Sequence, residues 1–192
     1  MKVLKAIKKI TKVFIITFLS VFGLLLVAFF VTGGNSSEGT ENKEVASSQT
    51  KKEETKKEDP ASEKFRKDVS NAISQLNEDI SYLFTLSDQV VSEPSLLVDE
   101  VWVTSVQLTT GDIKEGIEKV RAIKEPEDKD LKEVYEYLNY AMNHYSDIAN
   151  NFPKAVETLD STLFDKCIES MKLASYNMSV SNEAMDRYNE RF

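Results

Sequence analysis

The chain has 192 residues and a net charge of −8, with 24 Lys and Arg against 32 Asp and Glu, and it contains one cysteine and one histidine. A single cysteine excludes an intramolecular disulfide, so packing must hold the fold together. From residue 65 to the end, 13 Lys and Arg stand against 24 Asp and Glu, a net charge of −11. This net negative charge argues against nucleic acid or an anionic lipid surface as a partner of residues 65–192.

Residues 1–12 form a basic cytoplasmic tail with five lysines, and residues 13–32 are predicted to be a transmembrane signal-anchor. Of the 19 residues from Val13 to Val31, 15 are Leu, Ile, Phe or Val. At about 1.5 Å per residue the stretch spans roughly 28 Å, close to the hydrocarbon thickness of a bilayer. The lysines keep the N-terminus in the cytoplasm, so the rest of the chain is expected outside, in the cell membrane as a single-pass protein. Cleavage near Thr32, followed by secretion, is the alternative.

Residues 33–60 are predicted to be a disordered linker rich in Lys, Glu and Ser. Between Thr32 and Asp59 the chain has no aromatic residue and only two aliphatic side chains, Val45 and Ala46. Such a segment cannot bury enough apolar surface to fold alone. As a flexible tether it would span about 30 Å.

Residues 61–192 are predicted to fold as an all-α, antiparallel up-down four-helix bundle, because apolar residues recur at intervals of three and four and short connections join helices of about 30 residues. The expected buried faces are Phe65, Val69, Ala72, Ile73, Leu76, Ile80, Leu83, Ser87 and Val90; then Leu97, Val98, Val101, Trp102, Leu108, Ile113, Val120 and Ile123; then Leu131, Val134, Tyr135, Leu138, Ala141, Met142, Tyr145, Ile148 and Phe152; and finally Leu163, Phe164, Cys167, Ile168, Met171, Ala174, Met178, Met185 and Tyr188.

The helix boundaries follow from prolines and capping residues. Pro94 is expected to end the first helix, and the second is expected to run from about Ser95 to Lys124, before Pro126. The third starts near Asp128 or Asp130 and is bent rather than ended by Pro153, and Asp160 or Ser161 caps the fourth.

The middle of the second helix allows two interpretations. Ser105, Thr109, Asp112 and Gly116 occupy the centre of its expected apolar face as a candidate polar seam. Asp112 and Glu115 also fit a capping box after Gly111, which would restart the helix there. One kinked helix is the preferred interpretation.

No catalytic, cofactor-binding or metal site is predicted. A carboxylate-bridged metal bundle needs Glu-x-x-His pairs, and the chain has only His144. His144 and Asp147 lie outside the main apolar face, where a catalytic imidazole would lack a water-excluding pocket. Cys167 and Met171 could offer soft ligands to Cu(I), but methionines at helical spacing are more often core.

The candidate partner surface is a group of three residues on the third helix: Tyr137, Tyr140 and His144. At 100° per residue they lie 90° to 150° from the centre of that helix's apolar face. Amphipathic rings gathered on a surface are typical of protein-binding patches.

The layout resembles small, N-terminally membrane-anchored helical extracytoplasmic proteins of Gram-positive bacteria or their mobile elements. Within the helical part the resemblance depends on Gly111-Asp112, Pro126 and Leu159-Asp160. It implies an extracytoplasmic location and no enzymatic activity. The sequence therefore predicts a non-catalytic, membrane-tethered interaction domain of the cell envelope, with a protein partner there and the membrane contacted through residues 13–32. A small-ligand or metal-binding sensor acting through a partner protein is the alternative.

Overall fold

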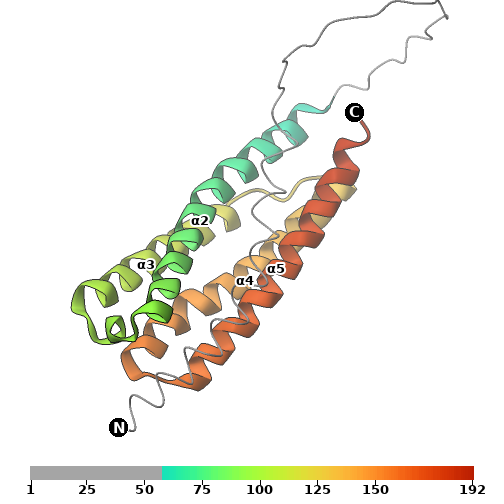
Figure 1. Ribbon diagram of the computed structural model, residues 1–192. Coiled ribbons are helices and arrows are strands. Elements are labelled where there is room, and N and C mark those ends of the chain that lie inside the picture. Colours follow the sequence, from blue (N-terminus) through green and yellow to red (C-terminus); the bar gives the residue numbers. More distant parts are fainter. Residues whose placement is uncertain (1–57) are drawn as a thin grey trace, which may run out of the picture.

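A computed structural model describes residues 58–192, which are all-α with no strand among them. Four long helices lie alongside one another, and each runs antiparallel to the next (Figure 1). They are α2 (Pro60–Ser92), α3 (Glu100–Arg121), α4 (Lys129–Thr158) and α5 (Ser161–Asn189), with a short 3₁₀ helix, η1 (Pro94–Val98), between α2 and α3. The predicted all-α four-helix arrangement is confirmed.

The predicted signal-anchor and linker lie outside the described residues. Within residues 58–192, none of the helices combines the length and the apolar character needed to cross a bilayer.

Each long helix begins at an aspartate whose side chain accepts hydrogen bonds from the first free backbone N–H groups. The four capping residues are Asp59, Asp99, Asp128 and Asp160. Asp128 and Asp160 were among the predicted starts, and α4 continues through Pro153 to Thr158 as expected. Leu159 then adopts a left-handed conformation, with φ of 52°, which turns the chain into α5.

The predicted start of the second helix is wrong. The chain forms η1 first, and Asp99 then has an extended backbone. The Asp99 side chain accepts a 2.9 Å hydrogen bond from the backbone N–H of Trp102. The α-helix therefore begins at Glu100. It then continues through Gly111 without a break, so the preferred single helix is confirmed and Asp112 is not a cap.

The buried face of α3 is rotated by about one residue from the predicted face. Val98, Val101 and Leu108 were expected inside but are exposed, whereas Val106 and Ile117 are buried. Thr109 and Thr110 are also buried, because their hydroxyls donate to the carbonyls of Ser105 and Val106 one turn earlier (Oγ1 to O, 2.8 and 2.9 Å). Thr109 lies on the expected face, whereas Thr110 takes a core position that the apolar pattern did not assign to it.

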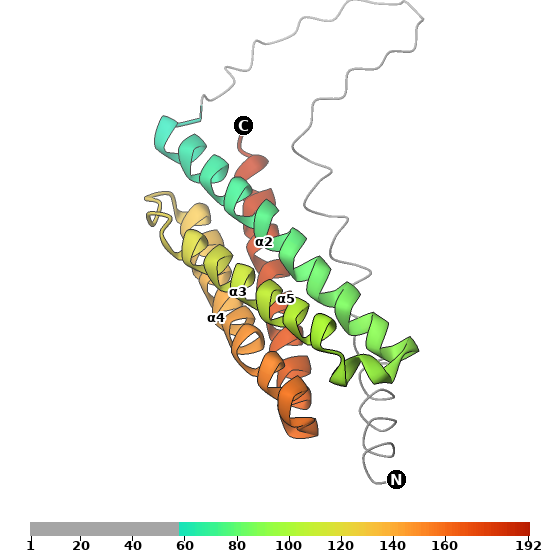
Figure 2. The same cartoon turned by 90° about the vertical axis from the view of Figure 1, so that its left-hand side faces the viewer.

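The bundle packs most closely where α4 meets α5. Alanines with no exposed surface lie on both helices: Ala141, Ala149 and Ala155 on α4, and Ala174 and Ala184 on α5. Small side chains let the two backbones approach, and the Ser181 hydroxyl donates to the Val134 carbonyl across the interface at 3.2 Å. Figure 2 shows α3 between α2 and α4. Each long helix packs against the helix that follows it in the sequence.

Candidate functional site: two exposed apolar surfaces and a polar end

The predicted partner surface lies on the outer side of α4. Tyr140 is 53% exposed, and Tyr137 and His144 are half-buried. The rings of Tyr137 and Tyr140 meet edge to face, with centroids 5.9 Å apart. The structure therefore brings the two tyrosines together on the surface, and His144 lies one turn beyond Tyr140.

Helix α5 adds residues to this surface that the sequence did not reveal. The ion pair between Glu133 of α4 and Arg187 of α5 (Oε2 to Nη2, 2.6 Å) marks the outer groove between the helices. Tyr137, Tyr140 and His144 follow Glu133 at intervals of four, seven and eleven, so they continue along that groove. Leu173 and Tyr176, fourteen and eleven residues before Arg187, continue it on α5.

These five residues form what we call the α4/α5 surface: Tyr137, Tyr140, His144, Leu173 and Tyr176. The two α5 members are 43% and 64% exposed. The Ser181–Val134 hydrogen bond sets the register and brings Tyr176 to the level of Tyr140. The exposed aromatic groups of two helices therefore share one face.

The predicted polar seam is not brought together as a site. Ser105 and Asp112 lie toward the outside of α3, whereas Thr109 is buried with its hydroxyl bonded to its own helix. Gly116, the fourth residue of that face, lies against Leu76 of α2. Thr109 and Gly116 are therefore in the interior, and only Ser105 and Asp112 of this face reach the surface.

The soft side chains of α5 are core residues. Cys167, Met171 and Met178 are all buried. Burial raises the pKa of the Cys167 thiol to about 12, and the Asp147 carboxylate adds to the effect. In residues 58–192, no three His, Cys, Asp or Glu side chains are grouped so that they could hold a metal ion.

A polar network closes the end of the bundle where α2 begins and α5 ends. Arg66 donates to Asn189 (Nη1 to Oδ1, 2.7 Å), and the Tyr188 hydroxyl donates to Glu58 (3.0 Å). The Arg191 guanidinium lies 4.6 Å from the centre of the Tyr188 ring.

Arg191 also joins this end to the start of α4. It donates to Asp130 at 2.9 Å and pairs with Asp128. Burial alone would raise the pKa of Asp128, but the hydrogen bond from Arg191 and those from the Leu131 and Asp130 backbones outweigh burial and lower it. The network thus ties α2, α4 and α5 together.

Replacing Arg191 by glutamine is expected to lower the free energy of unfolding at pH 7 by about 1 kcal/mol, because the pairs are partly exposed. A lowered carboxyl pKa contributes stability above the unfolded value near 4, and this contribution is lost as the pH falls through the folded value. The stabilities of the parent and the variant should therefore converge as the pH falls below the lowered pKa of Asp128. Urea unfolding from pH 2 to pH 7 measures both effects. Lys67→Gln, which removes an exposed pair with Glu63, should change stability by less than about 0.5 kcal/mol.

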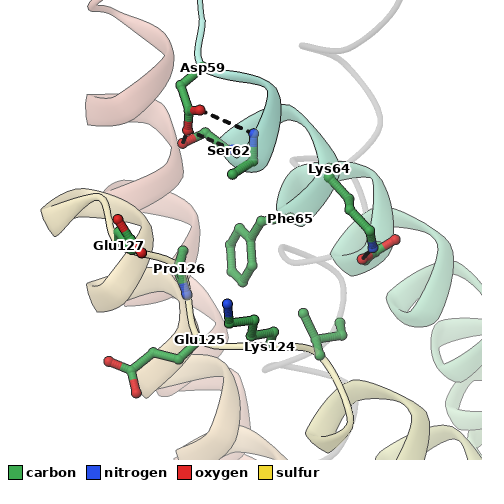
Figure 3. Close-up of a pocket in the computed structure, with 11 residues that line it drawn as sticks. Asp59, Ser62, Lys64, Phe65, Lys124, Glu125, Pro126 and Glu127 are labelled. Carbon is green, nitrogen blue, oxygen red and sulfur yellow. Dashed lines mark hydrogen bonds and ion pairs between the residues drawn. The ribbon is translucent and has the colours of Figure 1, made fainter.

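A cavity of about 470 Å³ lies beside this network, between the first two turns of α2 and the loop that joins α3 to α4. Figure 3 shows the Phe65 ring between the two walls, with Pro126 and Glu127 of the loop on one side and Lys64 on the other. Phe65, Ile123 and Pro126 make its wall partly apolar. Its charged lining residues are two lysines, Lys64 and Lys124, and four acids: Asp59, Asp68, Glu125 and Glu127.

No family model, curated protein or solved structure matches this chain.

Proposed function

We propose that the chain is a non-catalytic interaction protein of the cell envelope, tethered to the membrane through residues 13–32, which binds a protein partner on the α4/α5 surface. One observation carries the choice of surface: Tyr137, Tyr140 and Tyr176 gather on one outer face, and two of them are more than half exposed. Tyrosine offers a large contact area and a hydrogen-bonding group at low conformational cost, which is why it is frequent in binding hot spots.

The tether fits this role. The linker predicted from the sequence, roughly 28 residues long, would let the bundle search a radius of about 30 Å around its anchor. The net negative charge of the bundle, −11 from residue 65 to the end, disfavours contact with anionic lipid. The α4/α5 surface would then be free to meet proteins rather than headgroups.

A photoreactive amino acid at Leu173, in the full chain within intact cells, tests the proposal. A discrete protein adduct is expected, and the double variant Tyr140→Ala and Tyr176→Ala should reduce it by roughly tenfold or more, because each hot-spot truncation costs about 1 kcal/mol or more. The matched control is Tyr82→Ala, which removes an exposed tyrosine from α2 and should leave the adduct unchanged. An adduct that the double variant does not affect would show that the surface is wrongly assigned.

A small-ligand sensor is the second candidate, and the cavity at the polar end favours it. Its volume falls in the range typical of ligand pockets, about 300 to 1,000 Å³. Thermal melting of the full chain with copper and with a panel of metabolites separates the two functions. A ligand at 100 times its dissociation constant should add about 2.7 kcal/mol of stability. If no ligand changes the melting temperature, the sensor function is excluded and the interaction function is the one that stands.

A further inference from the structure

The outward face of α3 carries apolar side chains that the bundle does not use. Val101, Ser105, Leu108, Asp112, Glu115 and Lys119 follow one another at intervals of four, three, four, three and four, so they form one line along the helix. Val101 is 77% exposed and Leu108 is 65% exposed. This line is the one that the apolar pattern suggested as the buried face.

Helix α2 places a tyrosine beside this line. The Trp102 indole donates to the Leu86 carbonyl at 3.2 Å, and Gly116 lies against Leu76, so these two contacts fix the antiparallel register. Midway between them, Tyr82 lies level with Leu108. Tyr82 is 51% exposed and follows Gln75, which lines the outer groove, by seven residues. Tyr82, Val101 and Leu108 therefore share the outer side of the α2/α3 pair.

Acidic side chains gather at one end of the groove between α2 and α3, and lysines gather at the other. Asp79 and Asp112 lie close enough that the Asp112 charge helps to raise the pKa of Asp79, although burial is the main cause. Farther toward Arg121, the groove opens into a hollow of about 510 Å³ beside the small side chains of Ala72 and Ala122. Three lysines line it, Lys64, Lys119 and Lys124, against one carboxylate, Asp68, which pairs with Lys64. One end of the groove is thus apolar and acidic, and the other is hollow and basic.

We propose that this α2/α3 groove binds an amphipathic helix of a partner protein. The apolar face of that helix packs on Tyr82, Val101 and Leu108. Its flanks carry basic residues opposite Asp79 and Asp112, and acidic residues opposite the lysines of the hollow. The α3 helix is about 33 Å long, so five turns of a partner helix fit along it.

A second copy of the chain fits this groove less well. When two copies meet antiparallel on Val101 and Leu108, Asp112 of each faces the Asp99 and Glu100 end of the other. When they meet parallel, each charged residue faces the same residue of the other copy. Opposed like charges disfavour both arrangements, so the charge pattern selects a different chain.

The test measures the anisotropy of a labelled peptide titrated with the full chain in phosphatidylcholine nanodiscs. The peptide has about 18 residues, with leucines on one face, lysines flanking its first half and glutamates flanking its second. We expect saturable binding above that of empty nanodiscs. Leu108→Gln should weaken it by roughly tenfold, the change that burial of one leucine side chain predicts. Asp165→Asn, an exposed position of α5 outside both surfaces, should leave it unchanged.

A control peptide keeps the leucines but has glutamate at every flanking position, and it should bind at least several-fold more weakly. Equal binding of the two peptides overturns the proposal, as does a signal no larger than that of empty nanodiscs or a Leu108→Gln variant that binds as the parent does. Sedimentation that shows a dimer dissociated by Leu108→Gln would assign the groove to a second copy and overturn it too. These outcomes do not bear on the α4/α5 surface, which has its own experiment.

Discussion

Replacing Trp102 by alanine is expected to lower the free energy of unfolding by about 3 to 5 kcal/mol. The side chain is 4% exposed, and its indole N–H reaches back to the Leu86 carbonyl across the α2/α3 interface. Truncation leaves a large cavity and removes the indole hydrogen bond that joins α3 to α2. Urea unfolding followed by circular dichroism measures the loss without using tryptophan fluorescence.

The matched control is Leu108→Ala, two turns farther along the same helix. Leu108 is 65% exposed, so its truncation should change stability by less than about 0.5 kcal/mol. A loss of similar size in the two variants would mean that α3 is rotated from the orientation described.

Gly116→Leu is expected to lower the free energy of unfolding by about 3 kcal/mol. A Cβ at this position would already lie 3.0 Å from Leu76 Cδ1 and 3.3 Å from Leu76 Cβ. A full leucine side chain would have to push α2 and α3 apart or force Leu76 from its rotamer, which is the cost of overpacking a dense core. Thermal unfolding of the two proteins under the same conditions measures the difference.

Gly111→Leu provides the control, because a Cβ at Gly111 would meet nothing within 4 Å. Leucine is a better helix former than glycine by up to about 1 kcal/mol, so this variant should be unchanged or more stable. The opposite signs of the two substitutions are the test. Destabilisation by both would indicate that the second half of α3 is not packed as described.

Three of the four long helices could be predicted from the sequence because most of their apolar residues lie on a single face. The expected face of α2 is buried at almost every position from Phe65 to Val90, and Asp128 and Asp160 begin their helices as predicted. Here the spacing of apolar residues and the capping aspartates agree. Where the capping residue and the spacing of apolar residues indicate the same helix, that helix can be predicted from the sequence.

Helix α3 could not be predicted correctly because its apolar residues fall on two faces. Trp102 and Ile113 belong to the core, but Val101 and Leu108 belong to the surface. Thr109 and Thr110 look polar in the sequence, yet a helical threonine can satisfy its own hydroxyl and enter a core. A periodicity argument weighs hydropathy alone, so it grouped the exposed Val101 and Leu108 with the buried Trp102, Ile113 and Val120 on one broad face.

The candidate site was predictable in part. Tyr137 and Tyr140 could be placed on one surface because they share a helix, and helical spacing fixes their relative direction. Leu173 and Tyr176 could not be joined to them, since the register between α4 and α5 depends on the αL turn at Leu159 and on the Ser181–Val134 hydrogen bond. The outward position of Tyr176 on its own helix was the available signal.

Both ends of the described chain, Glu58 and Phe192, lie at the same end of the bundle (Figure 1). A pull exerted through the N-terminal segment therefore enters at the network of Arg66 and Tyr188, about 45 Å from the η1 turn when 30 residues of helix separate them. A partner held on the distal half of α2 and α3 would load these helices along their axes. Tension would have to slide the helices past one another rather than peel one away from its neighbour, so the bundle is built to bear load in its most resistant direction.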